Sequence, residues 1–190
     1  MALSEAKITI ELREILLNNR PKELYQISKK GTVPVLKVND LVIDQSIDIM
    51  RWAIEQSNLK WLDENREKQL NDININDTDF KYWLDRYKYH DRYPNNNKEY
   101  YMKKGTEILE KYEKQLEYTK FLSGNNIGLS DVAIFPFIRQ FCNVDSDWFM
   151  NNYNILSEWL STFLESELFL STMDKYDIWE NSSEKLILKF

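Results

Sequence analysis

The feature that most constrains the fold of this chain is a segment that is apolar on almost every side. Residues 129–141 read LSDVAIFPFIRQF, and their apolar side chains do not keep to one helical face. A helix of this kind is stable only where other elements surround it, because every side has to be shielded from water. The segment therefore predicts a buried helix in the middle of a helical bundle.

The residues before this segment carry the signals of a helix start. If Gly128 is the N-cap, Asp131 stands at the third helical position, where its carboxylate can accept from the N–H of the cap. Its charge also suits the positive end of a helix. A cap at Ser130 is the alternative, and it would leave Ile127 and Val132 without the contact of a hydrophobic staple.

Other helices follow from the spacing of apolar residues. Phe80, Trp83, Leu84 and Tyr87 recur at the i, i+3, i+4, i+7 interval of one helical face. Similar spacing predicts two more helices, within residues 101–116 and 156–164.

The first quarter of the chain has the different pattern of a small α/β domain. Alternating side chains predict strands, and Pro21 and the Asn39-Asp40 pair predict a helix start and a hairpin turn. The predicted elements are, in order, a strand at 8–12, a helix at 22–27, strands at 33–38 and 41–43, and a helix at 44–56. Polar residues rich in Asn and Asp follow, so we expect a domain over 1–57, a linker over 58–77 and a helical domain over 78–190.

Composition excludes several classes of protein. The formal net charge of −6 argues against a nucleic-acid binder, which needs a positive surface. One cysteine cannot form a disulfide within the chain, and one cysteine with one histidine is too few ligands for a Cys/His metal site. We see no secretory signal or apolar span of membrane length, so we expect a cytoplasmic protein with no membrane partner.

Three motifs, in order, resemble the glutathione transferase family. They are residues 31–36 (GTVPVL), residues 42–49 (VIDQSIDI) and residues 128–133 (GLSDVA). The resemblance covers about residues 3–179 and is nearest to bacterial, omega-like members that use a cysteine. It implies a thioredoxin-like N-terminal domain followed by an all-helical bundle.

The resemblance implies a site for glutathione as co-substrate. Val33 precedes Pro34, which matches the family's cis-proline, and its backbone would pair with the cysteinyl backbone of glutathione. Gln45 and Ser46 stand where the family holds the γ-glutamyl group with an acidic residue and a serine. Gln45 departs from the usual glutamate, and the lost charge attraction would weaken binding by about 1 kcal/mol. Arg20 lies where omega-like members carry a lysine near the glycyl end.

Each of these residues also has a structural interpretation. The Val33-Pro34 turn can define the fold without binding glutathione, Ser46 can cap the following helix, and Arg20 can be a solvated surface residue. Cys142 lies on the apolar segment and is interpreted as a core residue rather than a nucleophile. His90 is interpreted as a loop residue.

No catalytic residue is predicted. Cysteine-type members carry a Cys-Pro-Tyr or Cys-Pro-Phe loop after their first strand, with the thiolate at a helix N-terminus. This sequence has no such segment, and its residues 1–3 match the end of the family's first helix. Without the first strand, the strands at 8–12 and 35–38 would lose a ladder partner, so we expect an incomplete, weakened N-terminal half over an intact bundle.

Three hypotheses follow for the function. The first is a glutathione S-transferase family protein whose relatives transfer thiols or conjugate glutathione to a small electrophilic or disulfide substrate, with this chain slow or inactive. The second is a non-catalytic binding or scaffold module of the same fold, and the third is a fragment of a longer enzyme that starts at an internal Met. The resemblance also implies a homodimer.

Overall fold

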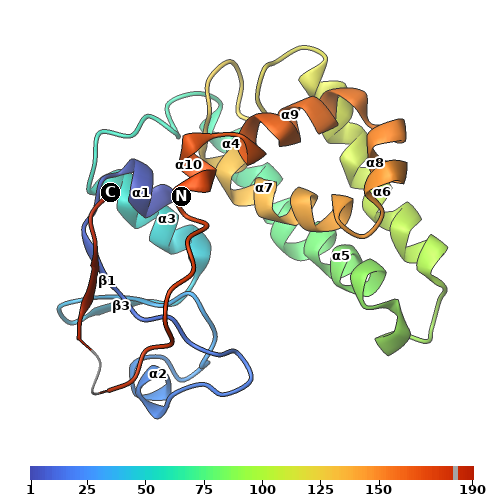
Figure 1. Cartoon of the computed structure of the whole chain (residues 1–190). Coiled ribbons are helices and arrows are strands. Elements are labelled where there is room, and N and C mark those ends of the chain that lie inside the picture. The colour runs from blue at the N-terminus through green and yellow to red at the C-terminus, as the bar shows by residue number, and fades with distance from the viewer. Residues whose placement is uncertain (182–183) are drawn as a thin grey trace. The chain divides into compact units, whose positions relative to one another are not determined.

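The computed structural model describes residues 1–181 and 184–190, and its helix α7 (Leu129–Cys142) is the predicted buried helix. Gly128 is its N-cap, and the N–H of Gly128 donates to Asp131 Oδ2 at 3.1 Å, which confirms the predicted cap. Helix α7 contacts α4, α5, α8 and α9 (Figure 1). The all-helical C-terminal bundle is therefore confirmed.

The bundle belongs to the second of two units, which spans Lys60–Ser166. Its elements are α4 (Arg66–Ile75), a π-helical turn (Asn76–Phe80), α5 (Lys81–Lys88), a 3₁₀ turn (His90–Arg92), α6 (Lys98–Leu116), α7, α8 (Ser146–Asn152) and α9 (Asn154–Leu164). Throughout the ranges described above, no helix combines the length and the apolar character needed to cross a membrane.

Helix α4 occupies the stretch that we expect to be a linker at residues 58–77. Its buried residues are Gln69, Asp72 and Ile73, so two of the three side chains that face inward are polar. Periodicity of apolar residues cannot detect such a helix. The chain passes from one compact unit to the other after Leu59 and returns after Ser166, and the predicted domain bounds stay a prediction.

The first unit is formed by Met1–Leu59 together with Glu167–Phe190. Its elements are α1 (Ala2–Glu5), β1 (Ile10–Leu12), α2 (Lys22–Ile27), β2 (Leu36–Val38), β3 (Leu41–Ile43), α3 (Ser46–Glu55), α10 (Glu167–Leu170) and β4 (Leu186–Leu188). The N-terminal order of strand, helix, strand, strand and helix is as predicted, and it makes the small thioredoxin-like part of the fold.

The strands of this unit form two separate antiparallel pairs. In one pair β2 faces β3, and in the other β1 faces β4 from the C-terminal tail. No ladder joins β1 to β2 among the residues with described structure.

Hydrogen-bond donors converge on the carboxylate of Asp131, which is fully buried in the second unit. Its Oδ1 accepts from the N–H of Leu122 at 2.7 Å and from Trp159 Nε1 at 3.0 Å. Its Oδ2 accepts from the N–H groups of Ser123 and Gly128, both at 3.1 Å, and from the Ser123 hydroxyl. Burial raises the pKa of this carboxyl, and the hydrogen bonds oppose that rise.

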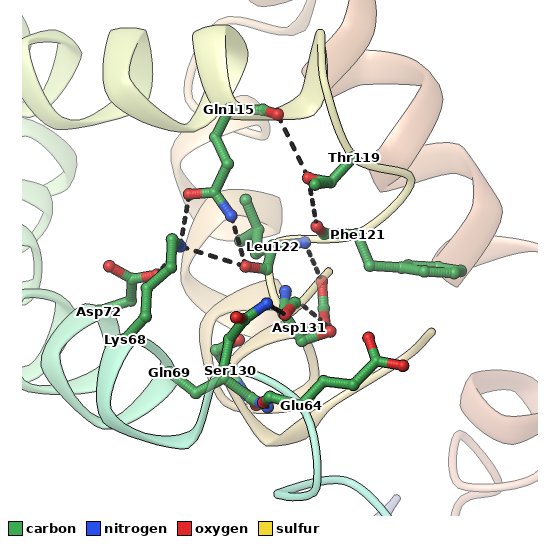
Figure 2. A network of polar contacts seen from close by, with 12 residues as sticks. Glu64, Lys68, Gln69, Asp72, Gln115, Thr119, Phe121, Leu122, Ser130 and Asp131 are labelled. Carbon is green, nitrogen blue, oxygen red and sulfur yellow. Dashed lines mark hydrogen bonds and ion pairs between the residues drawn. The ribbon is translucent and has the colours of Figure 1, made fainter. Parts of the chain in front are cut away.

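A second group of contacts attaches α4 to the same region (Figure 2). Gln69 Oε1 accepts from the N–H of Ser130 at 3.0 Å, while Gln69 Nε2 donates to the carbonyls of Trp61 and Glu64. Lys68 Nζ donates to the carbonyl of Leu122 at 3.3 Å. The start of α7 is thus held by residues from α4 and from the loop before α7.

Replacing Asp131 with Asn should destabilise the second unit by about 3 kcal/mol. The amide group keeps one acceptor oxygen and places an NH₂ against donors that then lack an acceptor. Urea unfolding followed by far-UV circular dichroism measures the loss. Asp147→Asn, an exposed first-turn residue of α8, is the matched control and should cost well under about 1 kcal/mol. Equal losses in the two variants would contradict the role of the Asp131 contacts.

Backbone amides of the first unit should exchange with solvent faster than those of α7. Only four apolar side chains of that unit are buried among the described residues, namely Ala2, Ile49, Ala53 and Phe169. Few buried contacts allow local opening at low free energy. Hydrogen exchange should give protection factors at least about tenfold lower in β1 to β3 than in α7. Equal, strong protection in both units would contradict this expectation.

Candidate functional site

The register of the β2–β3 hairpin brings two of the predicted binding segments to one end of the first unit. Leu36 pairs with Ile43 in an antiparallel ladder. Residues directly opposite in such a ladder have Cα atoms about 5 Å apart. Pro34 lies two residues before Leu36, and Gln45 lies two residues after Ile43. Because both segments leave the ladder at the same end, the turn that contains Val33 and the start of α3 are neighbours.

The start of α3 offers hydrogen-bond donors. Gln45 is the N-cap, and its side chain makes no capping hydrogen bond. The first N–H with an intrahelical acceptor is that of Ile49, which donates to the carbonyl of Gln45 at 3.0 Å. Within the described part of the chain, the N–H groups of Ser46, Ile47 and Asp48 and the Ser46 hydroxyl have no protein partner. These groups together with the positive helix end suit a carboxylate.

Val33 presents its backbone at the surface beside this helix start. The Val33–Pro34 peptide bond is cis, as the resemblance implies. Val33 is 45% exposed as a residue. Its N–H and C=O form no hydrogen bond with any residue that the structure describes. An extended ligand could therefore pair with this backbone as an added strand does.

Asp44 braces the two segments and was not assigned a role from the sequence. Its Oδ2 accepts from the Ser28 hydroxyl and its Oδ1 from Lys30 Nζ, both at 3.0 Å. Ser28 and Lys30 precede the Val33 turn, and Asp44 precedes α3. The ion pair with Lys30, followed by the Ser28 hydrogen bond, lowers the pKa of the Asp44 carboxyl. The position of Asp44 inside the 42–49 motif is the signal that could have found it.

Arg20 is not joined to this site by any described contact. Its Nε donates to the carbonyl of Leu17 at 3.1 Å, and its side chain is exposed. The exposed setting agrees with the interpretation of a solvated surface arginine, and a role toward a glycyl carboxylate stays a prediction.

The second unit holds the cysteine and the histidine. Cys142 is buried and unpaired by disulfide, and burial raises the pKa of its thiol. His90 begins a 3₁₀ turn, and its Nε2 atom lies 3.1 Å from Oδ1 of Asp91. Two cavities of about 190 and 370 Å³ are also lined by residues of the second unit alone, so neither includes a predicted glutathione-binding residue.

Family models match most of the chain. The model of the glutathione S-transferase N-terminal domain matches residues 1–56, and that of the glutathione S-transferase C-terminal domain matches residues 75–167. No curated protein matches the sequence. The finer likeness to omega-like, cysteine-type members stays a prediction.

Solved structures share the fold at low identity. A glutathione transferase from Phanerochaete chrysosporium in complex with oxidised glutathione is 16% identical with a TM-score of 0.77, covering 90% of this chain and 86% of its own. A family member from Pseudomonas fluorescens with two glutathione bound is 14% identical with a TM-score of 0.77, covering 90% and 84%. Glutathione S-transferase I from maize in complex with an atrazine glutathione conjugate is 19% identical with a TM-score of 0.74, covering 90% and 87%.

Acidification should loosen the site through Asp44. The folded-state pKa of this carboxyl lies below the ordinary value of 3.8, so its stabilising contribution is present above that pH and is lost as pH falls through the lowered pKa. Hydrogen-exchange protection factors of α3 amides, measured from pH 5 down to pH 2.5, should therefore decrease in the wild type.

In the Asp44→Asn variant, the α3 amides should have lower protection factors at pH 5. These factors should also fall less between pH 5 and pH 2.5 than in the wild type. The matched control is Asp48→Asn, because the Asp48 carboxylate lies in the same unit, 3.8 Å from Arg51. That variant should keep the wild-type pH response. An unchanged response in Asp44→Asn would show that other groups cause it.

Proposed function

The chain belongs to the glutathione S-transferase family, and we propose that its first unit binds glutathione at the end of the β2–β3 hairpin. The observation that carries the proposal is the Leu36–Ile43 pairing, which makes neighbours of the Val33 turn and the start of α3. Free backbone groups on both segments fit the two ends of one extended peptide ligand. Proteins of this fold with glutathione bound support the choice of ligand.

Each group has a part in this proposed binding. The Ser46 hydroxyl and the unpaired N–H groups of α3 hold the γ-glutamyl carboxylate. The amide oxygen of Gln45 accepts from the ligand's ammonium, without the charge attraction that a glutamate would add. The N–H and C=O of Val33 pair with the cysteinyl backbone, beside the cis Pro34. We assign the glycyl carboxylate to Arg20, as the resemblance implies.

We propose that this chain turns over substrate slowly or not at all. Thiol transfer needs an accessible thiolate at an electropositive position. Cys142 is the single cysteine, is 5% exposed and has a pKa raised by burial, so it does not meet that need. In the parent family the second substrate would be a small electrophile or a disulfide. The cytoplasmic location and the homodimer are part of the same proposal.

The buried state of Cys142 also favours a second candidate function, a non-catalytic glutathione-binding or scaffold module. Measurable conjugation of a thiol-reactive aromatic substrate would decide for the enzyme, and glutathione binding without turnover would decide for the module.

Ser46→Ala should weaken glutathione binding by about tenfold, because a hydrogen bond to a charged group contributes about 1.5 kcal/mol or more. Isothermal titration with reduced glutathione measures the change. The matched control is Ser57→Ala, which alters the hydroxyl beyond the other end of α3, where it donates to the carbonyl of Ala53 at 2.8 Å. That variant should bind as the wild type does.

Gln45→Glu should shift the affinity in the opposite direction. The added charge attracts the ligand's ammonium, and we expect about fivefold tighter binding. If Ser46→Ala binds unchanged and Gln45→Glu does not gain affinity, glutathione does not occupy this end of the hairpin.

A further inference from the structure

The smaller of the two cavities described above lies in the second unit, between helices α6 and α8 (Figure 1). Its volume is about 190 Å³, and its described lining residues are Thr106, Glu110, Trp148, Asn152 and Tyr153. Pockets for drug-sized ligands have volumes of about 300–1,000 Å³. This cavity therefore suits only a small molecule or the small end of a larger one.

Two aromatic side chains form part of the lining. The ring centres of Trp148 and Tyr153 are 5.8 Å apart, and the ring planes are inclined by 75°. The Tyr153 ring also packs on Phe149, with ring centres 5.3 Å apart. The N–H of Trp148 donates to Asp145 Oδ1 at 3.1 Å, which fixes the first turn of α8. The aromatic pair is thus held in place by its own neighbours.

The charge at the cavity is negative. Glu110 is the charged residue of the lining, and it is exposed. Burial and, after it, the negative charge of Glu110 raise the pKa of the Tyr153 hydroxyl to about 12, so this carboxylate acts on an aromatic residue of the lining. The described lining residues include no lysine, arginine or histidine. A cation is therefore attracted to this cavity, and an anion is repelled.

The polar side chains of the lining already donate hydrogen bonds within the protein. The Thr106 hydroxyl donates to the carbonyl of Lys103 at 2.7 Å, and Asn152 Nδ2 donates to the carbonyl of Trp148 at 2.8 Å. A carboxylate or phosphate ligand needs donors that are free. A quaternary ammonium needs none, because aromatic faces and a nearby negative charge are sufficient to hold it.

We propose that this cavity binds a small organic cation of the quaternary ammonium type. The rings of Trp148 and Tyr153 contact the methyl groups of the cation, and the Glu110 carboxylate compensates its charge. All the described lining residues belong to the second unit, so the inference does not depend on glutathione binding in the first unit.

Choline and its uncharged dimethylbutanol analogue, in which carbon replaces the nitrogen, test this proposal in the full chain. The two probes have the same shape and differ in charge. Nitrogen–proton correlation spectra follow the indole N–H of Trp148, which is assigned by its loss in Trp148→Phe. Choline should shift this resonance with a millimolar dissociation constant and bind at least about fivefold more tightly than the analogue.

Glu110→Gln should weaken choline binding by about fivefold and leave binding of the analogue unchanged. The matched control is Glu107→Gln on the same helix, because the Glu107 carboxylate pairs with Lys104 at 2.8 Å and is not among the described lining groups. That variant should bind choline as the wild type does, and far-UV circular dichroism checks that both variants are folded. Equal binding of the two probes, equal losses in the two variants, or a Trp148 resonance that choline does not shift would overturn the proposal.

Discussion

The buried carboxylate of Asp131 is the interaction on which the rest of the bundle depends. A charged group removed from water costs several kcal/mol unless donors replace its hydration. Here backbone N–H groups from the preceding loop, the cap of α7 and the indole of Trp159 on α9 supply those donors. One side chain therefore positions three segments at once. Helix α7 packs on α4, α5, α8 and α9. A shift in the position of its first turn would therefore disturb the packing of most of the second unit.

Local signals identified the elements of the bundle but not the contacts that join them. Gly128 and Asp131 are three residues apart, so their hydrogen bond could be predicted from sequence. Trp159 lies 28 residues beyond Asp131, and no local rule indicates that pair. The spacing of apolar residues does not indicate helix α4, for a related reason. Gln69 faces inward because it satisfies the backbone of α7, and a buried polar side chain carries no hydrophobic period.

In the first unit, too, local sequence patterns predicted elements but not the contacts between residues far apart in the chain. Turn residues and proline predicted α2 and β3 to the residue, and the hairpin register then made neighbours of Val33 and Gln45. Asp44 braces this site through Ser28 and Lys30, 16 and 14 residues away, which the motif alone does not reveal. The pairing of β4 with β1 joins segments about 176 residues apart, and no local pattern indicates such a pair.

The two units place stability and the chemistry for glutathione binding in different parts of the molecule. The candidate site is made of exposed backbone groups in the unit with few buried apolar side chains. A ligand that binds only the folded form adds stability that grows with its concentration, about 2.7 kcal/mol at one hundred times its dissociation constant. That gain matters most where the unit itself has few buried apolar side chains, so a ligand at the proposed site would also order the first unit. In the second unit, by contrast, the buried side chains of Asp131 and Gln69 already have hydrogen-bond partners within the protein.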